Sequence, residues 1–414
     1  MIISKPDLEN FLDDTIQLSN FEIELATFEQ QDEWQIKDDT ISHKTGGFFH
    51  LIGLQLKDKQ KLMLYQPQGA FNGLIFTVKK GQVFLLIQAR IEPGNSGIGQ
   101  FGPTIQSTPA NYLRLHGGKQ TPYLDYFMGL KPNSKLVFNS TQLDLGERYY
   151  QKTKILSYVF VEDELHLHQG MCWVSLNTIQ ECLFTDNFLN TDLKSMLGIF
   201  DWDSLLKPDT KTNDTHIELK IPYYKSDCNS KFIGLSELID WDITNHGIEA
   251  QNPKEDISAK LFRVKTLTRE KMEWYQPLIT FSKKGRFILC YKIIENEYYF
   301  LLKYGSEFGI PGQFVFQPSF NFYAEDDDFL IDPSWNLIHN IIQSEEGGRF
   351  YKNENDYQIF EIINDLELKQ DQSWFSTKQF KRILLTSNLC SIQLRCIASL
   401  VLPILNPSTF DSSN

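Results

Sequence analysis

QLDLGERYY at residues 142–150 and QSEEGGRFY at residues 343–351 decide how this chain is organised, because they are two copies of one segment. The pairs that share a separation of 201 positions are Gln142 and Gln343, Gly146 and Gly347, Arg148 and Arg349, Trp173 and Trp374, and Asn187 and Asn388. Upstream, Trp34 and Trp241, and Gln66-Pro67 and Gln276-Pro277, keep the same order at slightly larger separations. Loop insertions and deletions between two copies of one unit produce such drift.

The length of 414 residues agrees with two domains, because it exceeds what one hydrophobic core usually fills. We expect an N-terminal helical extension at 1–33, a first repeat at 34–197, a linker at 198–240 and a second repeat at 241–414. Within the linker, KPDTKTNDT at 207–215 is polar and lacks apolar periodicity.

Each repeat alternates apolar and polar residues as strands do. HLIGLQLK (50–57), GLIFTVKK (73–80) and QVFLLIQARI (82–91) predict strands, the last two forming a hairpin; GRFILCYKII (285–294) and EYYFLLKYG (297–305) repeat that hairpin. WVSLNTIQECL (173–183) and WFSTKQFKRILL (374–385) predict a tryptophan leading into a helix, with Ser175 as N-cap in the first copy. The fold class we predict is α+β, with two tandem repeats that each hold a mixed β-sheet with flanking helices.

Charge, apolar segments and cysteine content restrict the partners and the location that we expect for this protein. The net charge of −13 disfavours duplex nucleic acid or an anionic membrane, which bind proteins through Lys and Arg. The first residues lack a basic region followed by an apolar run, and no apolar stretch approaches about 18 residues, so we expect a cytoplasmic protein without a membrane partner. Six cysteines without a CxxC pair favour buried free thiols and predict no metal site.

Polar and glycine residues concentrate in QARIEPGNSGIGQFGPTIQSTPANYLRLHGGKQTPYLDYF at 88–127, directly after a predicted strand. Glycines there allow backbone to approach a ligand closely. This stretch predicts a pocket wall, the alternative being a long ordered loop that satisfies its own backbone.

Within that stretch, EPGN (92–95), GPTIQST (102–108), NYLRLHGG (111–118) and YLDYF (123–127) resemble the NDP-hexose 2,3-dehydratases of deoxysugar biosynthesis. SHKTGGFF (42–49), YQP (65–67) and QSEEGGRFY (343–351) extend the resemblance to the whole chain. The resemblance implies two Nudix-like domains, usually in a homodimer, acting without cofactor on a nucleotide-linked 4-keto-6-deoxyhexose that we expect to be dTDP-linked. The implied likeness to Nudix proteins is one of fold only, because the REx₂EEx glutamate cluster that holds magnesium in Nudix hydrolases is missing from this sequence.

The implied reaction needs three kinds of group. A base removes the C3 proton that the C4 ketone acidifies, donors stabilise the enolate oxygen, and an acid assists departure of the C2 hydroxyl. For proton transfer we single out His116, Glu92, Tyr112 and His43. Alternatives are a surface loop histidine at 116, a carboxylate capping the PGN turn at 92, an edge-ordering role for His43 and sugar stacking by Tyr112.

Guanidinium groups suit a diphosphate, because they bind its oxygens bidentately. The cationic candidates are Arg90, Arg114, Lys119, Arg148 and Arg349. Aromatic rings after the last two arginines, Tyr149 and Phe350 among them, could stack on the base. The other predicted substrate-binding residues are Gln66, Asn95, Thr104, Gln106, Asn111, Glu345 and Glu346.

The two copies have diverged unevenly. Glu92, Thr104 and Gln106 correspond to Glu307, Ser319 and Asn321, while the surroundings of Arg114 and His116 are replaced by the acidic AEDDDFLIDP (324–333). Because clustered carboxylates repel a diphosphate, we expect the second site to be vestigial. QSEEGGRFY, in contrast, is altered in the first copy: either each pocket tolerates drift there, which we favour, or the working site borrows Glu345, Glu346 and Arg349 from the second copy.

Two rival functions remain open from the sequence. One is a protein that binds nucleotide sugars without turning them over. The other is a nucleotide-sugar hydrolase of Nudix type, which needs magnesium and a glutamate cluster.

Overall fold

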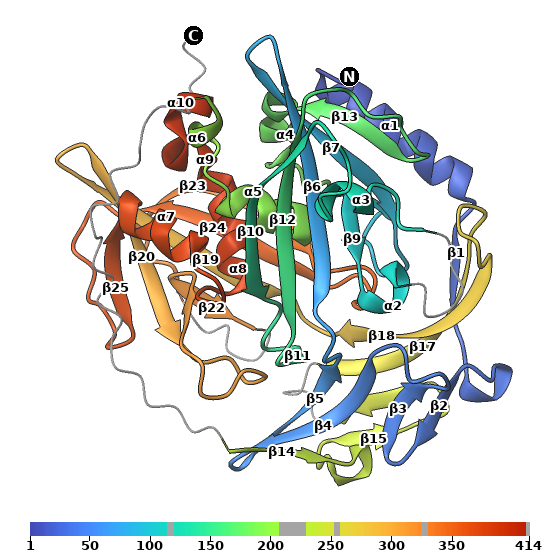
Figure 1. The fold of residues 1–414 in the computed structure, drawn as a ribbon. Coiled ribbons are helices and arrows are strands. Elements are labelled where there is room, and N and C mark those ends of the chain that lie inside the picture. Colours follow the sequence, from blue (N-terminus) through green and yellow to red (C-terminus); the bar gives the residue numbers. More distant parts are fainter. Residues whose placement is uncertain (114–119, 207–228, 252–256, 324–329, 411–414) are drawn as a thin grey trace.

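The computed structural model describes residues 1–113, 120–206, 229–251, 257–323 and 330–410 (Figure 1). The chain forms two large mixed β-sheets, two smaller sheets and helices between and around them. No helix among these residues is long and apolar enough to cross a bilayer. The α+β class predicted from the sequence is confirmed, whereas the likeness to the Nudix fold stays a prediction.

The large sheet of the first repeat has seven strands in the order β10-β12-β6-β7-β13, with β8 beside β7 and β9 beside β6. Its strands are β6 (Ala70–Lys79), β7 (Gln82–Ile91), β8 (Gly99–Gly102), β9 (Ile105–Ser107), β10 (Ser134–Leu143), β12 (Thr153–Val161) and β13 (Met171–Ser175). β12 and β6 run parallel and the other pairs antiparallel. The predicted hairpin is β6–β7, which turns at Lys80 and Gly81, both with positive φ.

The large sheet of the second repeat has the same connectivity. Its strands are β19 (Gly285–Ile294), β20 (Glu297–Gly305), β21 (Val315–Gln317), β22 (Phe320–Phe322), β23 (Asn336–Ser344), β24 (Glu354–Glu361) and β25 (Gln372–Ser376). Single residues confirm the match. The Thr104 hydroxyl accepts from one strand of its hairpin (2.9 Å) and donates to the other (2.5 Å), and the Ser319 hydroxyl does the same in the second copy (2.7 and 2.6 Å).

The two smaller sheets exchange strands between the repeats. One contains β2 (Trp34–Lys37), β3 (Thr40–His43), β4 (His50–Leu56), β5 (Lys59–Tyr65), β11 (Tyr149–Tyr150) and β14 (Ser230–Ile233). The other contains β1 (Glu22–Leu25), β15 (Trp241–Ile243), β16 (Gly247–Ala250), β17 (Ile257–Lys265) and β18 (Glu273–Phe281). β1, which precedes the first repeat, pairs with β17 of the second, and β14, which precedes the second repeat, pairs with β4 of the first. The segments expected to be extension and linker therefore supply sheet strands.

One pairing from the sequence is wrong. Gln66-Pro67 follow β5, whereas Gln276-Pro277 lie inside β18, where Pro277 is opposite Leu261. Leu64 pairs with Tyr149 and Ile279 pairs with Phe350, so Leu64 and Ile279 are the equivalent positions. A dipeptide match within a strand-rich region does not fix register.

Helices fill the space between the sheets. α5 (Thr191–Ile199) and α8 (Ile392–Ala398) lie side by side at the centre of Figure 1, where a Cβ on Gly198 would stand 2.1 Å from the Arg395 carbonyl oxygen. Their packing joins the repeats through one continuous core. The other helices are α1 (Lys5–Ser19), η1 (Phe28–Gln30), α2 (Pro109–Tyr112), α3 (Leu124–Phe127), α4 (Leu176–Cys182), α6 (Asp203–Leu206), η2 (Leu235–Glu237), α7 (Thr377–Leu385), η3 (Ser399–Val401), α9 (Leu402–Leu405) and α10 (Pro407–Phe410). Ser175 caps α4 as predicted, by accepting from the Thr178 amide.

Candidate active site

The loop after β7 docks on the QSEEGGRFY segment of the other repeat. The Gly94 amide donates to the Gly347 carbonyl (2.7 Å), and the Lys352 amide donates to the Gly94 carbonyl (2.7 Å). Only glycine fits at 94, because a Cβ would stand 1.7 Å from the Phe350 carbonyl oxygen. The loop after β20 docks in the same way on QLDLGERYY, with the Gly309 amide donating to the Gly146 carbonyl (2.7 Å). Each repeat therefore contributes a segment to the polar region of the other.

At the first of these contacts lies a cavity of about 120 Å³. Its lining residues are Ala70, Asn72, Arg90, Glu92, Pro93, Gln106, Ser107, Thr108, Asn111, Lys152, Lys154 and Asp192 from the first repeat, and Arg269, Gln276, Glu346, Gly348 and Arg349 from the second. Both repeats line this cavity, although Glu345 does not, and which of the two arrangements forms the working site stays a prediction. Glu346 and Arg349 line the same cavity as Arg90 and Glu92.

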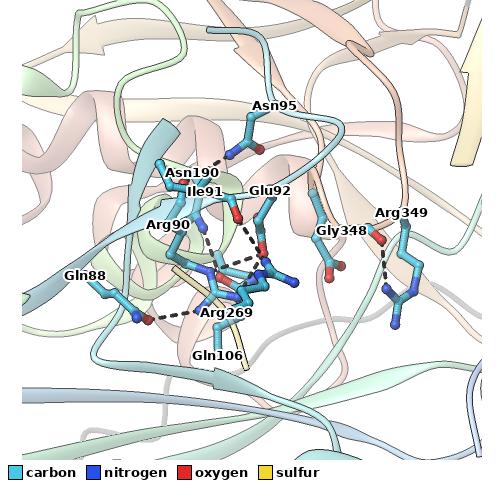
Figure 2. A network of polar contacts seen from close by, with 12 residues as sticks. Gln88, Arg90, Ile91, Glu92, Asn95, Gln106, Asn190, Arg269, Gly348 and Arg349 are labelled. Carbon is cyan, nitrogen blue, oxygen red and sulfur yellow. Dashed lines mark hydrogen bonds and ion pairs between the residues drawn. The ribbon is translucent and has the colours of Figure 1, made fainter. Parts of the chain in front are cut away.

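The cavity gathers three guanidinium groups. Arg90, at the end of β7, donates to Glu92 (2.8 Å) and to Gln88 (3.1 Å), so its plane is fixed from two sides (Figure 2). Arg269 reaches this group from the second repeat and donates to the Ile91 carbonyl (2.8 Å).

The third guanidinium, Arg349, donates to the carbonyl of the adjacent Gly348 (2.7 Å) and lies 4.5 Å above the ring of buried Phe49. Its Nε has no hydrogen-bond partner among the described residues. The three cations together favour an anionic ligand that accepts several hydrogen bonds.

A buried charge cluster forms another wall. The Lys154 ammonium lies 2.8 Å from Asp192, 3.3 Å from Asp144 and 3.5 Å from Glu346, and Lys152 lies 3.0 Å from Asp144. Four of these side chains come from the first repeat and Glu346 comes from the second. Each lysine side chain is at most 3% exposed. Such a cluster holds charge inside the protein only because every ion has an opposite neighbour.

The cluster pushes its groups toward different protonation states. Burial raises the pKa of Glu346, but Lys154, Lys152 and Arg349 outweigh it and hold that pKa well below the ordinary value. For Asp192, burial together with the nearby Glu346 and Asp144 outweighs Lys154 and raises the pKa. Burial lowers the pKa of Lys152 despite the facing carboxylates. Carboxyls with opposite shifts in one cavity suit separate proton-transfer and charge-stabilising roles.

The predicted site residues divide into three groups. Those that line the cavity are Arg90, Glu92, Gln106, Asn111, Glu346 and Arg349. Those placed elsewhere are His43, Gln66, Asn95, Thr104, Tyr112, Arg148, Tyr149, Glu345 and Phe350. Arg114, His116 and Lys119 lie outside the described residues, as does the acidic segment 324–329 on which the vestigial second site was argued. Their roles stay predictions.

Several of the predicted residues that do not line the cavity make hydrogen bonds that stabilise the fold. Thr104 uses its hydroxyl within the β6–β7 sheet. The Asn95 amide donates to the Arg90 and Ile98 carbonyls (3.4 and 3.2 Å), which closes the loop that carries Glu92. His43 contacts the Thr45 hydroxyl (2.8 Å).

The idea that the rings after the arginines stack on a nucleotide base is wrong for Tyr149 and Phe350. Both are fully buried and pack edge to face 5.9 Å apart across the junction of the repeats. A ring with no exposed face cannot accept a base. Arg148 likewise lies over Phe281 and Tyr323 of the second repeat (4.7 and 5.1 Å).

Sequence reasoning missed Lys152, Lys154, Asp192, Arg269, Gln276 and Asn72. A signal existed for three of them in the same comparison of copies. At the constant separation of 201 positions, Lys152, Lys154 and Asp192 correspond to Asn353, Asn355 and Gln393. At these three positions the first copy carries a charged side chain and the second copy a neutral amide.

Comparison with known proteins identifies the family of this chain. A family model described as NDP-hexose 2,3-dehydratase matches residues 5–200 and 223–401. Three relatives are named dTDP-4-dehydro-6-deoxy-alpha-D-glucopyranose 2,3-dehydratase. That of Saccharopolyspora spinosa is 24% identical, and the match covers 96% of this chain and 91% of the relative. For that of Amycolatopsis orientalis the identity is 22% and the coverages are 92% and 86%, and for that of Streptomyces violaceoruber they are 23%, 87% and 88%.

In the described part of the chain, no three His, Cys, Asp or Glu side chains are grouped as metal ligands would be.

Proposed function

Since this chain belongs to the NDP-hexose 2,3-dehydratase family, we propose that it dehydrates a dTDP-linked 4-keto-6-deoxyhexose at the cavity between its two repeats. The C3 proton leaves to a base, the C2 hydroxyl departs as water, and the resulting enol becomes a 3,4-diketo-2,6-dideoxyhexose nucleotide. One observation carries the proposal: a single cavity joins three arginines to a buried cluster of lysines and carboxylates. The names of three relatives support this substrate.

The arginines bind the diphosphate in this proposal. Arg90 is held in place by Glu92 and Gln88, and Arg269 by the Ile91 carbonyl, so their free N–H groups point from fixed supports. Arg349 adds a third cation from the second repeat. Fixed guanidinium groups bind phosphate oxygens with little further loss of side-chain entropy.

The elimination uses the other wall. Glu92 is the base, as the sequence suggested, and it lines the same cavity as Lys154 and Asp192. Asp192 is the acid, because its raised pKa keeps the proton available for the departing hydroxyl. Lys154 and Lys152 place positive charge where the C4 oxygen becomes an enolate. His116 remains an alternative base.

The test uses dTDP-4-keto-6-deoxyglucose that carries deuterium at C3. We expect loss of the label to water together with elimination, detected by NMR and by mass. Binding without exchange would contradict the dehydratase and leave a binding protein, and release of a nucleoside monophosphate would indicate a hydrolase.

The same assay tests the base. Glu92→Gln is expected to slow washout by roughly 100- to 10,000-fold while sparing dTDP binding. The control is Glu181→Gln on the exposed side of α4, which should behave as wild type. Unchanged washout in Glu92→Gln would transfer the role to another group, His116 first.

Other parts of the expected function rest on the sequence. We propose a cytoplasmic homodimer that binds no nucleic acid and no membrane, and a second repeat whose own polar region is vestigial. The neutral amides at Asn353, Asn355 and Gln393 support the last point.

A further inference from the structure

Asn72 is a buried amide that makes no side-chain hydrogen bond in the described part of the chain. It lies on β6, lines the cavity and is 0% exposed. Neither its Nδ2 nor its Oδ1 has a hydrogen-bond partner among the described residues. A buried polar group without a partner destabilises a fold, so such a group in a native protein calls for an explanation.

Asn72 lies on the same wall of the cavity as the charge cluster. It is opposite Gln106 of β9, and Ala70, two residues earlier on the same face of β6, pairs with Lys154 of β12. All four residues line the cavity. Asp192, which also lines it, has an unpartnered carboxyl oxygen of its own among the described residues.

The fold itself does not need an amide here. In the second repeat Phe287 is opposite Asn321 of β22, as Asn72 is opposite Gln106, so Phe287 is the equivalent residue. Its ring is fully buried and packs 5.3 Å from Tyr323 and 5.1 Å from Tyr357. The same position of the fold therefore accepts a buried apolar side chain.

We propose that Asn72 determines recognition of the hexose, with Nδ2 donating to the C4 keto oxygen and Oδ1 accepting from the neighbouring C3 hydroxyl. This inference rests on the proposed function for the identity of the sugar. A carboxamide presents one donor and one acceptor side by side, and a ketone beside a hydroxyl presents the complementary pair. A diphosphate offers acceptors alone, which the arginines match better.

The test compares Asn72→Leu with Thr77→Val. Thr77 is a matched control on the same strand: it is 0% exposed and its hydroxyl is also unpartnered among the described residues, but it does not line the cavity. Calorimetry measures the affinity for dTDP and for dTDP-6-deoxyglucose, which keeps the C3 hydroxyl and an acceptor oxygen at C4 but has no ketone and so cannot be dehydrated. Asn72→Leu should leave dTDP affinity unchanged and weaken the hexose ligand roughly 10- to 100-fold, with a similar fall in kcat/KM for the 4-keto substrate.

Thermal melting adds an independent measurement. Without ligand, Asn72→Leu should melt at or above the wild-type temperature, because it removes an unpaired buried amide. Hexose affinity equal to wild type would overturn the inference, since the amide would then hold only water. Equal losses for dTDP and its hexose, with a lower melting temperature, would also overturn it by making Asn72 a structural residue.

Binding does not depend on turnover, so the two proposals fail separately. A wild-type protein that releases no deuterium refutes the dehydratase. If Asn72→Leu still loses only the hexose contribution to binding, the hexose-recognising role stands.

Discussion

Replacing Lys154 by asparagine should cost the protein a large share of its stability. Lys154 is 2% exposed and is shared by Asp192, Asp144 and Glu346 at 2.8, 3.3 and 3.5 Å. Asparagine occupies the equivalent position 355 of the second repeat, so the backbone accepts it. Removing the cation leaves buried carboxylates that repel each other, and loss of one partner from a buried pair costs about 3–5 kcal/mol.

Urea unfolding followed by fluorescence measures this change. At pH 7 we expect the midpoint of the transition that reports the core to fall by about 1–2 M. The matched control is Lys284→Asn, which breaks a pair of similar length with Glu354 (2.9 Å) at a lysine side chain that is 50% exposed. Exposed pairs contribute about 0–1 kcal/mol, so this control should stay within about 0.5 M of wild type.

The pH dependence of the difference has a definite sign. Lys154 lowers the folded-state pKa values of Asp192, Asp144 and Glu346, so these pKa values are higher in Lys154→Asn than in the wild type. A carboxyl whose folded pKa is raised destabilises the fold as pH rises above its unfolded value. The deficit of Lys154→Asn should therefore be larger at pH 8 than at pH 5. A loss at pH 7 no greater than that of Lys284→Asn, or a deficit that grows toward pH 5, would refute the reasoning.

Two further variants test the cavity and its counterpart. Arg349→Ala should weaken dTDP binding by roughly 10- to 100-fold in calorimetry, since a hydrogen bond to a charged group contributes about 1.5–3 kcal/mol. The control Arg382→Ala, on the exposed face of α7, should bind dTDP as the wild type does. Equal affinities of the two variants would mean that the second repeat does not contribute to the site. Burial and the nearby Glu147 raise the pKa of Glu307 from 4.5 to about 8, so this group makes the wild type less stable as pH rises from about 5 to 8. Glu307→Gln should reduce that loss of stability in thermal melting. Plots of melting temperature against pH that run parallel for the two proteins would contradict the raised pKa.

The sequence predicted the parts of the fold that depend on short-range pattern. Alternating residues identified β6, β7, β19 and β20, and Ser175 marked the start of α4, because strand alternation and helix capping are local. Residue spacing predicted the equivalent positions of the two repeats less well where only a dipeptide matched. Gln66-Pro67 and Gln276-Pro277 are not equivalent, because register depends on which strands pair rather than on a shared dipeptide.

Of the candidate site, the sequence found the residues of one continuous stretch, together with Glu346 and Arg349 of the second copy. Arg90, Glu92, Gln106 and Asn111 come from 88–127 and do line the cavity. Lys154 and Asp192 went unrecognised, because they are remote in sequence and meet only when β12 and α5 pack together. Burial of Tyr149 was equally hidden, since a strand pattern does not reveal which face meets another domain.

The sequence by itself determined that this chain is a duplicated α+β protein of the dehydratase family. Repeats, periodicity and substitutions between copies can all be read along one dimension. Only the tertiary structure decided that the cavity belongs to both copies, with Glu346, Arg349 and Arg269 brought to Arg90 and Glu92. That assembly depends on reciprocal docking of Gly94 on Gly347 and of β1 and β14 on opposite repeats, contacts that join residues hundreds of positions apart.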